Sequence, residues 1–273
     1  MFSRPNLLSA LVSMALSVCA AAPASAQQPL LRDFRWTGAV PAGSSLSVDN
    51  AWGDVRLRAG GTDRRVEVLG SLQPGEEQAV APDVRVTTEP GVLAVRVVVS
   101  PVHQGLRSPR ADLVLFVPEG VAVAVRTQAG LIEAKGLRGD ATLVAERGDI
   151  LAKGIRGALC ARSERGTVTA ELETASHRSQ SLESLTGDLT AYLWEDASVT
   201  VEAATSGEIS TDFTLHVEYL KSQEPNKRAV AVLGTGEARL HMESKEGRVR
   251  ILRLPRSFRK EGPDAPKPDV SHP

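Results

Sequence analysis

The chain contains little cysteine and few aromatic residues. Two cysteines, Cys19 and Cys160, occur among 273 residues, and aromatic residues make up 4% of the sequence. Because hydrophobic residues still account for 42%, a core must be filled by Val, Leu, Ile and Ala, and such side chains suit stacked strands. We therefore expect a β-rich protein that is stabilised by aliphatic packing.

The sequence also lacks a concentrated run of positive charge. It has 32 Lys and Arg against 33 Asp and Glu, which gives a formal net charge of -1, and the basic residues are spread along the chain. Nucleic acid binding needs a focused positive surface that displaces counterions. We therefore do not expect a nucleic acid partner.

Familiar catalytic and ligand-binding motifs are missing as well. Neither a Gly-x-Ser-x-Gly nucleophile motif nor a Gly-x-x-x-x-Gly-Lys phosphate loop occurs. The histidines make no pair with metal-ligand spacing, and no cysteine cluster accompanies them; they are His103, His177, His216, His241 and His272. The sequence predicts no catalytic residue, no metal site and no cofactor.

Residues 1–26 have the three-part pattern of a secretory signal. Arg4 lies in a short polar start, residues 7–22 are mostly apolar, and Ala24-Ser25-Ala26 is a small-x-small cleavage site. A retained membrane anchor is the alternative, but the apolar run is short for a membrane span. We expect an exported protein, periplasmic or at the cell surface or outside the cell, with no transmembrane segment after signal removal.

Removal of the signal would leave Cys160 as the single cysteine, which cannot make an internal disulfide. It lies in the apolar stretch 158–161. We interpret Cys160 as a core residue rather than a nucleophile, because no histidine is placed nearby to activate it.

The middle of the chain repeats itself. Residues 123–139 and 141–157 share the sequence Ala-Lys-Gly-(Leu/Ile)-Arg-Gly, and Gly130, Gly148 and Gly166 are eighteen residues apart. Further Gly-x-(Ile/Val/Leu) motifs centre on Gly53, Gly187, Gly207 and Gly247. We interpret the forty residues between Gly207 and Gly247 as two coils.

Glycines at half this spacing divide each repeat into two segments of nine residues, and nine residues hold one strand and a tight turn. A helical crossover would need a dozen residues or more. The sequence therefore predicts an all-β fold, a parallel β-solenoid (β-helix) of coils of about 18–20 residues. Its inward columns would be Ile132, Ile150 and Val168; Ala134, Ala152 and Ala170; and Leu137 and Ile155.

The flanks of the repeat are less regular. Residues 27–118 are expected to start and cap the solenoid, with strands at 65–69 and 111–117 and a hairpin over 84–98 that turns at Pro90-Gly91. Residues 119–254 would form the coils, and 255–273 a disordered tail that protects an exposed last strand, 248–254.

Three acidic residues, Asp54, Asp149 and Asp188, each follow a repeat glycine. They could form a carboxylate row for calcium or for acid–base attack on a glycan, or they could hydrogen-bond local backbone N–H groups in turns. The equivalent positions elsewhere carry no consistent charge, since they are Leu131, Thr167, Glu208 and Arg248. We favour the turn interpretation.

The best candidates for ligand contact are two aromatic residues and one loop histidine. Tyr192 and Trp194 alternate on one strand beside Glu195-Asp196, and could stack on a sugar ring or simply cover a coil. His177 lies in a polar insertion between coils and could contact a partner.

The chain resembles the bacterial DUF4097 family, whose members are named as candidate adhesins. The resemblance rests on Val48-Asp49-Asn50-x-x-Gly53-Asp54-Val55, on Val117-Pro118-Glu119-Gly120 and on the serial glycine motifs, and it covers residues 34–254. It implies a β-solenoid at the cell envelope and no catalytic residues.

Three functions remain open at this point. The first is a non-catalytic, adhesin-like binder or scaffold, monomeric, whose partner is an envelope protein or a polysaccharide. The second is a β-helix polysaccharide lyase or hydrolase, which the short coils and sparse aromatics disfavour. The third is a structural protein that self-associates through the solenoid ends. We expect the first.

Overall fold

The computed structural model describes residues 31–61, 63–75, 81–98, 108–172, 178–221 and 223–255. The expected signal segment, nearly all of the expected tail, and His103, His177 and His272 lie outside these residues. The described residues form 21 strands and contain no helix long and apolar enough to cross a membrane.

The strands, in chain order, are β1 Arg32–Ala39, β2 Ser45–Trp52, β3 Val55–Ala59, β4 Arg65–Gln73, β5 Asp83–Glu89, β6 Val92–Val98, β7 Arg110–Val117, β8 Val123–Ala129, β9 Ile132–Lys135, β10 Ala141–Arg147, β11 Ile150–Ile155, β12 Leu159–Arg165, β13 Val168–Leu172, β14 Ser179–Ser184, β15 Leu189–Trp194, β16 Val199–Thr205, β17 Ile209–Thr211, β18 His216–Tyr219, β19 Lys227–Leu233, β20 Ala238–Ser244 and β21 Val249–Leu254.

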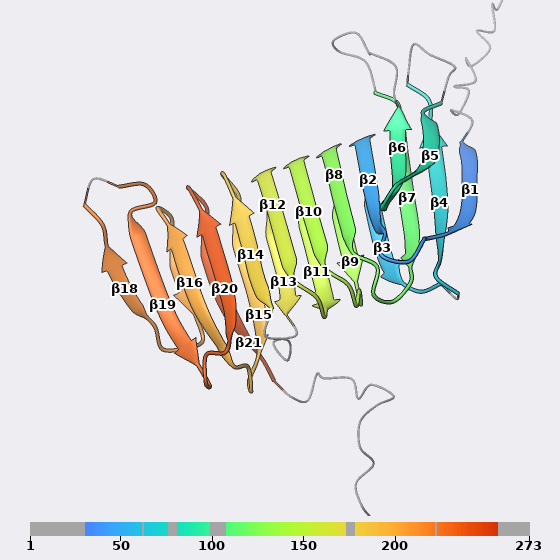
Figure 1. Cartoon of the computed structure of the whole chain (residues 1–273). Coiled ribbons are helices and arrows are strands. Elements are labelled where there is room, and N and C mark those ends of the chain that lie inside the picture. The colour runs from blue at the N-terminus through green and yellow to red at the C-terminus, as the bar shows by residue number, and fades with distance from the viewer. Residues whose placement is uncertain are drawn as a thin grey trace, which may run out of the picture.

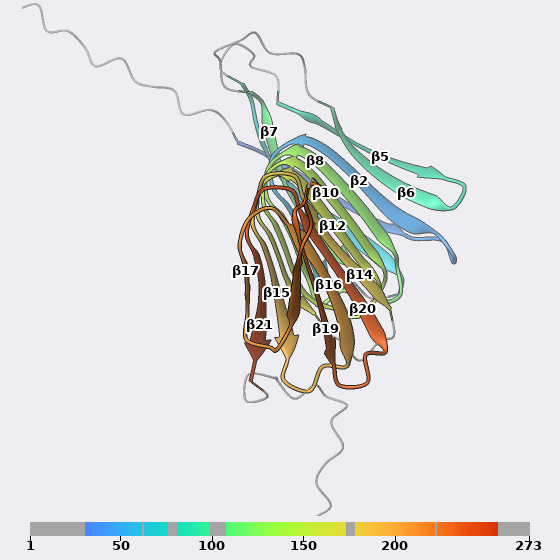
Figure 2. The same ribbon diagram turned by 90° about the vertical axis from the view of Figure 1, so that its left-hand side faces the viewer.

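The strands form two sheets that face each other across one core (Figures 1 and 2). Sheet A has the order β1-β4-β7-β3-β9-β11-β13-β15-β21-β17, and sheet B the order β18-β19-β16-β20-β14-β12-β10-β8-β2-β6-β5. A pair such as β10 and β11 makes one coil, with one strand in each sheet. Neighbouring coils pair in parallel, which confirms the predicted parallel β-solenoid.

The predicted aliphatic columns lie inside the solenoid. Ile150 is in register with Ile132 and Val168, and the alanines two positions further along β11 and its neighbours are stacked in the same way. Every predicted member of the three columns is at most 2% exposed. Full burial of one Ile or Val side chain contributes roughly 1.5–3 kcal/mol relative to exposure, so each added coil stabilises its neighbours.

Glycines lie at the corners because neighbouring coils approach closely there. A Cβ atom on Gly166 would lie 2.1 Å from the carbonyl oxygen of Gly148, and one on Gly148 would lie 2.0 Å from that of Gly130. Gly148 also has a φ of 152°, which L side chains rarely adopt. The corner therefore excludes side chains by contact at Gly166, and by both contact and conformation at Gly148.

A buried polar column runs along the same corner at the end of the sheet B strands. Most of its hydroxyl groups donate to the corner glycine of an adjacent coil, as Ser163 Oγ does to Gly148 O at 2.9 Å and Ser244 Oγ to Gly187 O at 2.9 Å. The Thr127 hydroxyl is the exception and has no hydrogen-bond partner among the described residues. The column consists of Asn50, Thr127, Ser163, Ser184, Ser244 and Thr205, with Ala145 in register between Thr127 and Ser163. These contacts satisfy backbone carbonyls that the corner removes from the sheet ladders.

The order of coils in space differs from their order in the sequence at both ends. The coil β2–β3, around Gly53, pairs directly with β8–β9, and the later coil β6–β7 lies outside it. At the other end β20–β21 lies between β14–β15 and the earlier coil β16–β17. The first and last coils are therefore both interior.

This arrangement corrects two predictions. The residues between Gly207 and Gly247 do not form two stacked coils, because the chain after β17 makes the antiparallel strands β18 and β19 before it returns. The last strand, β21, is not an exposed edge, because it pairs with β15 on one side and β17 on the other.

Antiparallel strands and partly buried aromatic residues cover the two ends. Phe34 and Trp36 on β1 pack against the core at one end, and Phe213 and Leu215, between β17 and β18, pack against it at the other. The predicted hairpin over 84–98 is present as β5 and β6. The outermost strands are β1 and β5 at one end and the short β17 and β18 at the other.

Candidate functional site

Cys160 points away from the core, which makes the core prediction wrong. Its neighbours Leu159 and Ala161 are 1% and 0% exposed, and Cys160 is exposed between them. Side chains alternate between the two faces of a strand, so two inward aliphatic neighbours place Cys160 on the outer face of sheet B.

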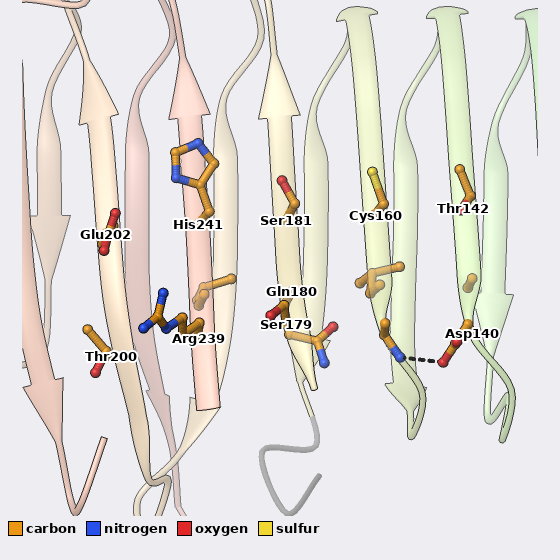
Figure 3. A pocket seen from close by; sticks show the side chains of 14 residues that line it. Asp140, Thr142, Cys160, Ser179, Gln180, Ser181, Thr200, Glu202, Arg239 and His241 are labelled. Carbon is orange, nitrogen blue, oxygen red and sulfur yellow. Dashed lines mark hydrogen bonds between the residues drawn. The ribbon is translucent and has the colours of Figure 1, made fainter. Parts of the chain in front are cut away.

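Cys160 is one member of an outward row that crosses five strands. Thr142 on β10, Cys160 on β12, Ser181 on β14, His241 on β20 and Glu202 on β16 are successive register partners. Figure 3 shows these five side chains side by side on the outer face of sheet B. We call this set the polar row.

A groove of about 540 Å³ follows the polar row. Its lower wall is formed by Asp140, Ser179, Arg239 and Thr200, each two residues before a member of the polar row (Figure 3). The groove is hollow because the side chains of Thr142, Cys160 and Ser181 are short, whereas longer charged side chains flank them. It therefore offers a shallow polar trough that runs across the strands.

The charges of the groove are largely balanced. Asp140 lies 3.8 Å from Arg178, and Glu202 lies 3.5 Å from Arg228, measured between charged atoms. Arg239 adds a cation to the lower wall. No charge of one sign therefore prevails along the trough.

The Cys160 thiol is not activated. Desolvation of its sulfur raises the pKa of Cys160 above its ordinary value, and the nearby Glu183 carboxylate raises it further. Because the thiolate is the nucleophilic form, a raised pKa keeps this side chain a neutral thiol at pH 7.

The acidic residues after the corner glycines bind backbone groups of the adjacent coil. Asp149 Oδ1 accepts a hydrogen bond from Thr167 N at 2.7 Å, and Asp188 Oδ1 accepts one from Arg248 N at 2.8 Å. Asp54 Oδ1 similarly accepts from Leu131 N. The expected backbone role is present, but the donor lies in the next coil rather than in the local turn, so these carboxylates clamp coils together.

The pKa of Asp188 is lowered below its ordinary value of 3.8. The largest cause is the hydrogen bond from Arg248 N, and the guanidinium groups of Arg248 and Arg250 add to it. Both arginines lie 3.2 Å from Asp188 Oδ2. The carboxylate is therefore held ionised by structural contacts.

A second charged network lies on the outer face of sheet A, near the N-terminal end. Burial would raise the pKa of Glu133, but hydrogen bonds from Lys135 and Arg58 bring it below its ordinary value of 4.5. Arg56 lies 3.7 Å from Glu133 and 2.8 Å from Asp54, which links the two acids. Each carboxylate is already occupied by cations, so this network acts as a structural one.

The predicted aromatic contact residues do not lie in the groove. Tyr192 and Trp194 belong to β15 of sheet A, on the other side of the core. Trp194 is 4% exposed, so its ring is covered, while Tyr192 is half-buried beside Glu171 and Leu252. Their role as ligand contacts stays a prediction.

Carboxylates are not arranged for glycoside hydrolysis within the groove. Asp140 and Glu202 belong to strands four intervals apart, about 19 Å at the usual strand spacing, whereas glycosidase carboxylates lie about 5–9.5 Å apart. Glu183 and Glu243, on the upper side, are register neighbours. However, Glu183 accepts a hydrogen bond from Ser181 and contacts Arg162, and Glu243 contacts His241.

No group of three His, Cys, Asp or Glu side chains within the described ranges is arranged to hold a metal ion. The groove as a whole was not predicted from the sequence. The signal that was available is the alternation around Cys160, together with the short polar residues at the same position of successive coils, Thr142 and Cys160.

Two comparisons returned no relative: no family model matches the sequence, and no curated protein matches it. The DUF4097 resemblance therefore stays a prediction from motifs.

Solved structures similar to this chain include a candidate cell adhesion protein from Clostridium sporogenes, with 12% identity and a TM-score of 0.46, over 82% of this chain and 100% of that one. A candidate adhesin from Bacteroides fragilis has 12% identity and a TM-score of 0.41, over 83% and 99%. At these sequence identities and TM-scores, the similarity assigns no role to this chain.

Proposed function

We propose that this chain is an exported, non-catalytic protein of the cell envelope that binds a partner along the groove of sheet B. The role is that of an adhesin-like binder or scaffold. The observation that carries the proposal is the polar row, which places five short or polar side chains in register across five strands.

Three features support a binder rather than an enzyme. The groove is an open trough of about 540 Å³, whereas catalysis profits from a site that excludes water. The carboxylates of its two ends lie too far apart for paired acid–base work. The thiol of Cys160 has a raised pKa, which disfavours nucleophilic attack.

The test uses the exported chain and an immobilised panel of bacterial polysaccharides and envelope proteins, with retention and released products measured together. Thr142→Arg places a long cation in the trough at an exposed position. Thr169→Arg makes the same change on the outer face of sheet A, on β13, and serves as the matched control. Circular dichroism melts verify that both variants fold.

We expect the protein to bind at least one panel member without cleaving it. The Thr142→Arg variant should bind that member at least tenfold more weakly, and the Thr169→Arg variant should bind it as the unchanged chain does. Release of shortened products would overturn the non-catalytic proposal in favour of a lyase or hydrolase. If Thr142→Arg does not change retention, the proposal that the groove is the binding site would be overturned.

A further inference from the structure

The spacing of the polar row restricts what can lie along it. Neighbouring strands are about 4.7–4.9 Å apart, so the row presents one side chain at each such interval from Thr142 to Glu202. A ligand that contacts every member must repeat at nearly the same interval.

An extended peptide does not meet this condition. It rises about 3.2–3.4 Å per residue, and its side chains repeat on one face every two residues, at about 6.6 Å. The side chains of such a peptide therefore no longer lie opposite the members of the row after two strands. In a β-1,4-linked pyranose chain each sugar advances by a distance close to the strand spacing. Successive sugars are turned over, but each ring carries hydroxyl groups on both edges, so one hydroxyl-bearing unit can lie over each strand.

The chemistry of the row matches hydroxyl groups. The Thr142 hydroxyl can donate one hydrogen bond and accept others, and Glu202 accepts while Arg239 donates. The Ser181 hydroxyl donates to Glu183 Oε1 at 3.1 Å, so its oxygen is oriented to accept. A trough that contains both donors and acceptors suits a polyhydroxylated chain better than an apolar one.

The charge balance indicates an uncharged chain. The two acids of the groove face Arg178 and Arg228 at 3.8 and 3.5 Å. An anionic polysaccharide would meet these carboxylates, and a cationic one would meet Arg239. Neither a positively nor a negatively charged ligand would therefore meet a net opposite charge in the groove.

We propose, on the basis of the binding function above, that the groove takes an uncharged 1,4-linked polysaccharide that lies across the strands of sheet B with about one sugar over each coil. The five strands that carry the polar row span about 19 Å at the usual spacing. The bound segment is therefore about five sugars long.

The test measures affinity by titration calorimetry for β-1,4-linked glucose oligomers and β-1,4-linked N-acetylglucosamine oligomers of two to eight sugars. We expect affinity in at least one series to rise with each sugar up to about five and then to change less than twofold. Ser181→Arg, in the middle of the row, should abolish the dependence on length beyond two sugars, whereas Thr169→Arg should leave it intact.

Comparison ligands separate this proposal from the binding function. Two outcomes would overturn the uncharged 1,4-linked ligand while supporting the groove as the binding site. In the first, binding is sensitive to Thr142→Arg but shows no plateau near five sugars. In the second, such binding is at least as strong for polygalacturonate or for an extended Ser/Thr peptide. If the panel and both oligomer series show no groove-dependent binding, both proposals fall.

Discussion

Two buried hydroxyl groups at equivalent corners of sheet B differ in their contacts. Ser163 Oγ donates to Gly148 O at 2.9 Å. Thr127 Oγ1 has no hydrogen-bond partner in the described part of the chain, and the Gly53 carbonyl at the corresponding place accepts from Asn50 Nδ2 at 3.2 Å. Deletion of each hydroxyl therefore measures what the polar column contributes.

We expect Ser163→Ala to lower the free energy of unfolding by about 1–2 kcal/mol, because it leaves a buried carbonyl without its donor. Thr127→Val removes a buried hydroxyl that has no partner, and we expect no loss or a small gain. Chemical denaturation of both variants with unchanged m-values checks this. Equal losses in the two variants would mean that the column acts through packing alone.

Asp188 links stability to pH. A carboxyl whose pKa is lowered in the folded state stabilises that state above its unfolded pKa of about 3.9, and this contribution is lost as the pH falls through the folded pKa. Asp188→Asn keeps an oxygen acceptor for Arg248 N but loses attraction to Arg248 and Arg250.

We therefore expect Asp188→Asn to cost about 1 kcal/mol at pH 7 and progressively less as the pH falls through the folded pKa, where the native carboxyl becomes protonated too. Urea unfolding across this range measures the difference. Glu195→Gln, at an exposed turn, is the control and should show a smaller change. A cost for Asp188→Asn that does not decrease as the pH is lowered would contradict the electrostatic explanation.

Sequence reasoning succeeded for the inner columns and failed for Cys160 for related reasons. The columns repeat at every coil, so aliphatic residues at equivalent positions of several coils all indicate the same buried environment. Cys160 was assigned by the apolar character of residues 158–161, although alternation with Leu159 and Ala161 places it outside. The groove could not be predicted, because its lining comes from five strands between residues 140 and 241 whose neighbours are set by tertiary register.

At the scale of elements, the coil β20–β21 connects the C-terminal layer to the rest of the solenoid. β16 pairs with β20 and β19, and β17 pairs with β21. In the described chain the layer β16–β19 reaches β14 and β15 through this inserted coil. The sequence could not predict the insertion, since the Gly207 and Gly247 motifs encode the same corner and do not specify which coil lies inside.

We expect a chain that ends at Gly236 to keep the coils up to β15 but to lose native order over residues 199–233, because those strands lose their parallel partners. Limited trypsin digestion should then cleave after Lys227 and Arg228, which the full chain protects. A chain that begins at Val40 and lacks β1 is the control, since it removes one edge strand. Continued protection of Lys227 and Arg228 in the shortened chain would contradict this account.

At the scale of the whole molecule, the two outer faces of the solenoid differ in what they offer a partner. The N-terminal part of the sheet A face carries arginines and acids that already contact one another, such as Arg58 with Glu133 and Arg110 with Asp112. The sheet B face carries the trough. The proposed binding function therefore uses the sheet B face. Thr142→Arg tests that face, and Thr169→Arg tests the sheet A face.

The interior position of the last coil has a consequence for biogenesis. A polypeptide emerges from the ribosome with its N-terminus first, so β16 to β19 appear while their native neighbours β20 and β21 are still enclosed. The C-terminal layer can reach its final place only after residue 254 is free. The C-terminal layer is thus completed later than the coils up to β15, which do not need β20 or β21 as inner neighbours.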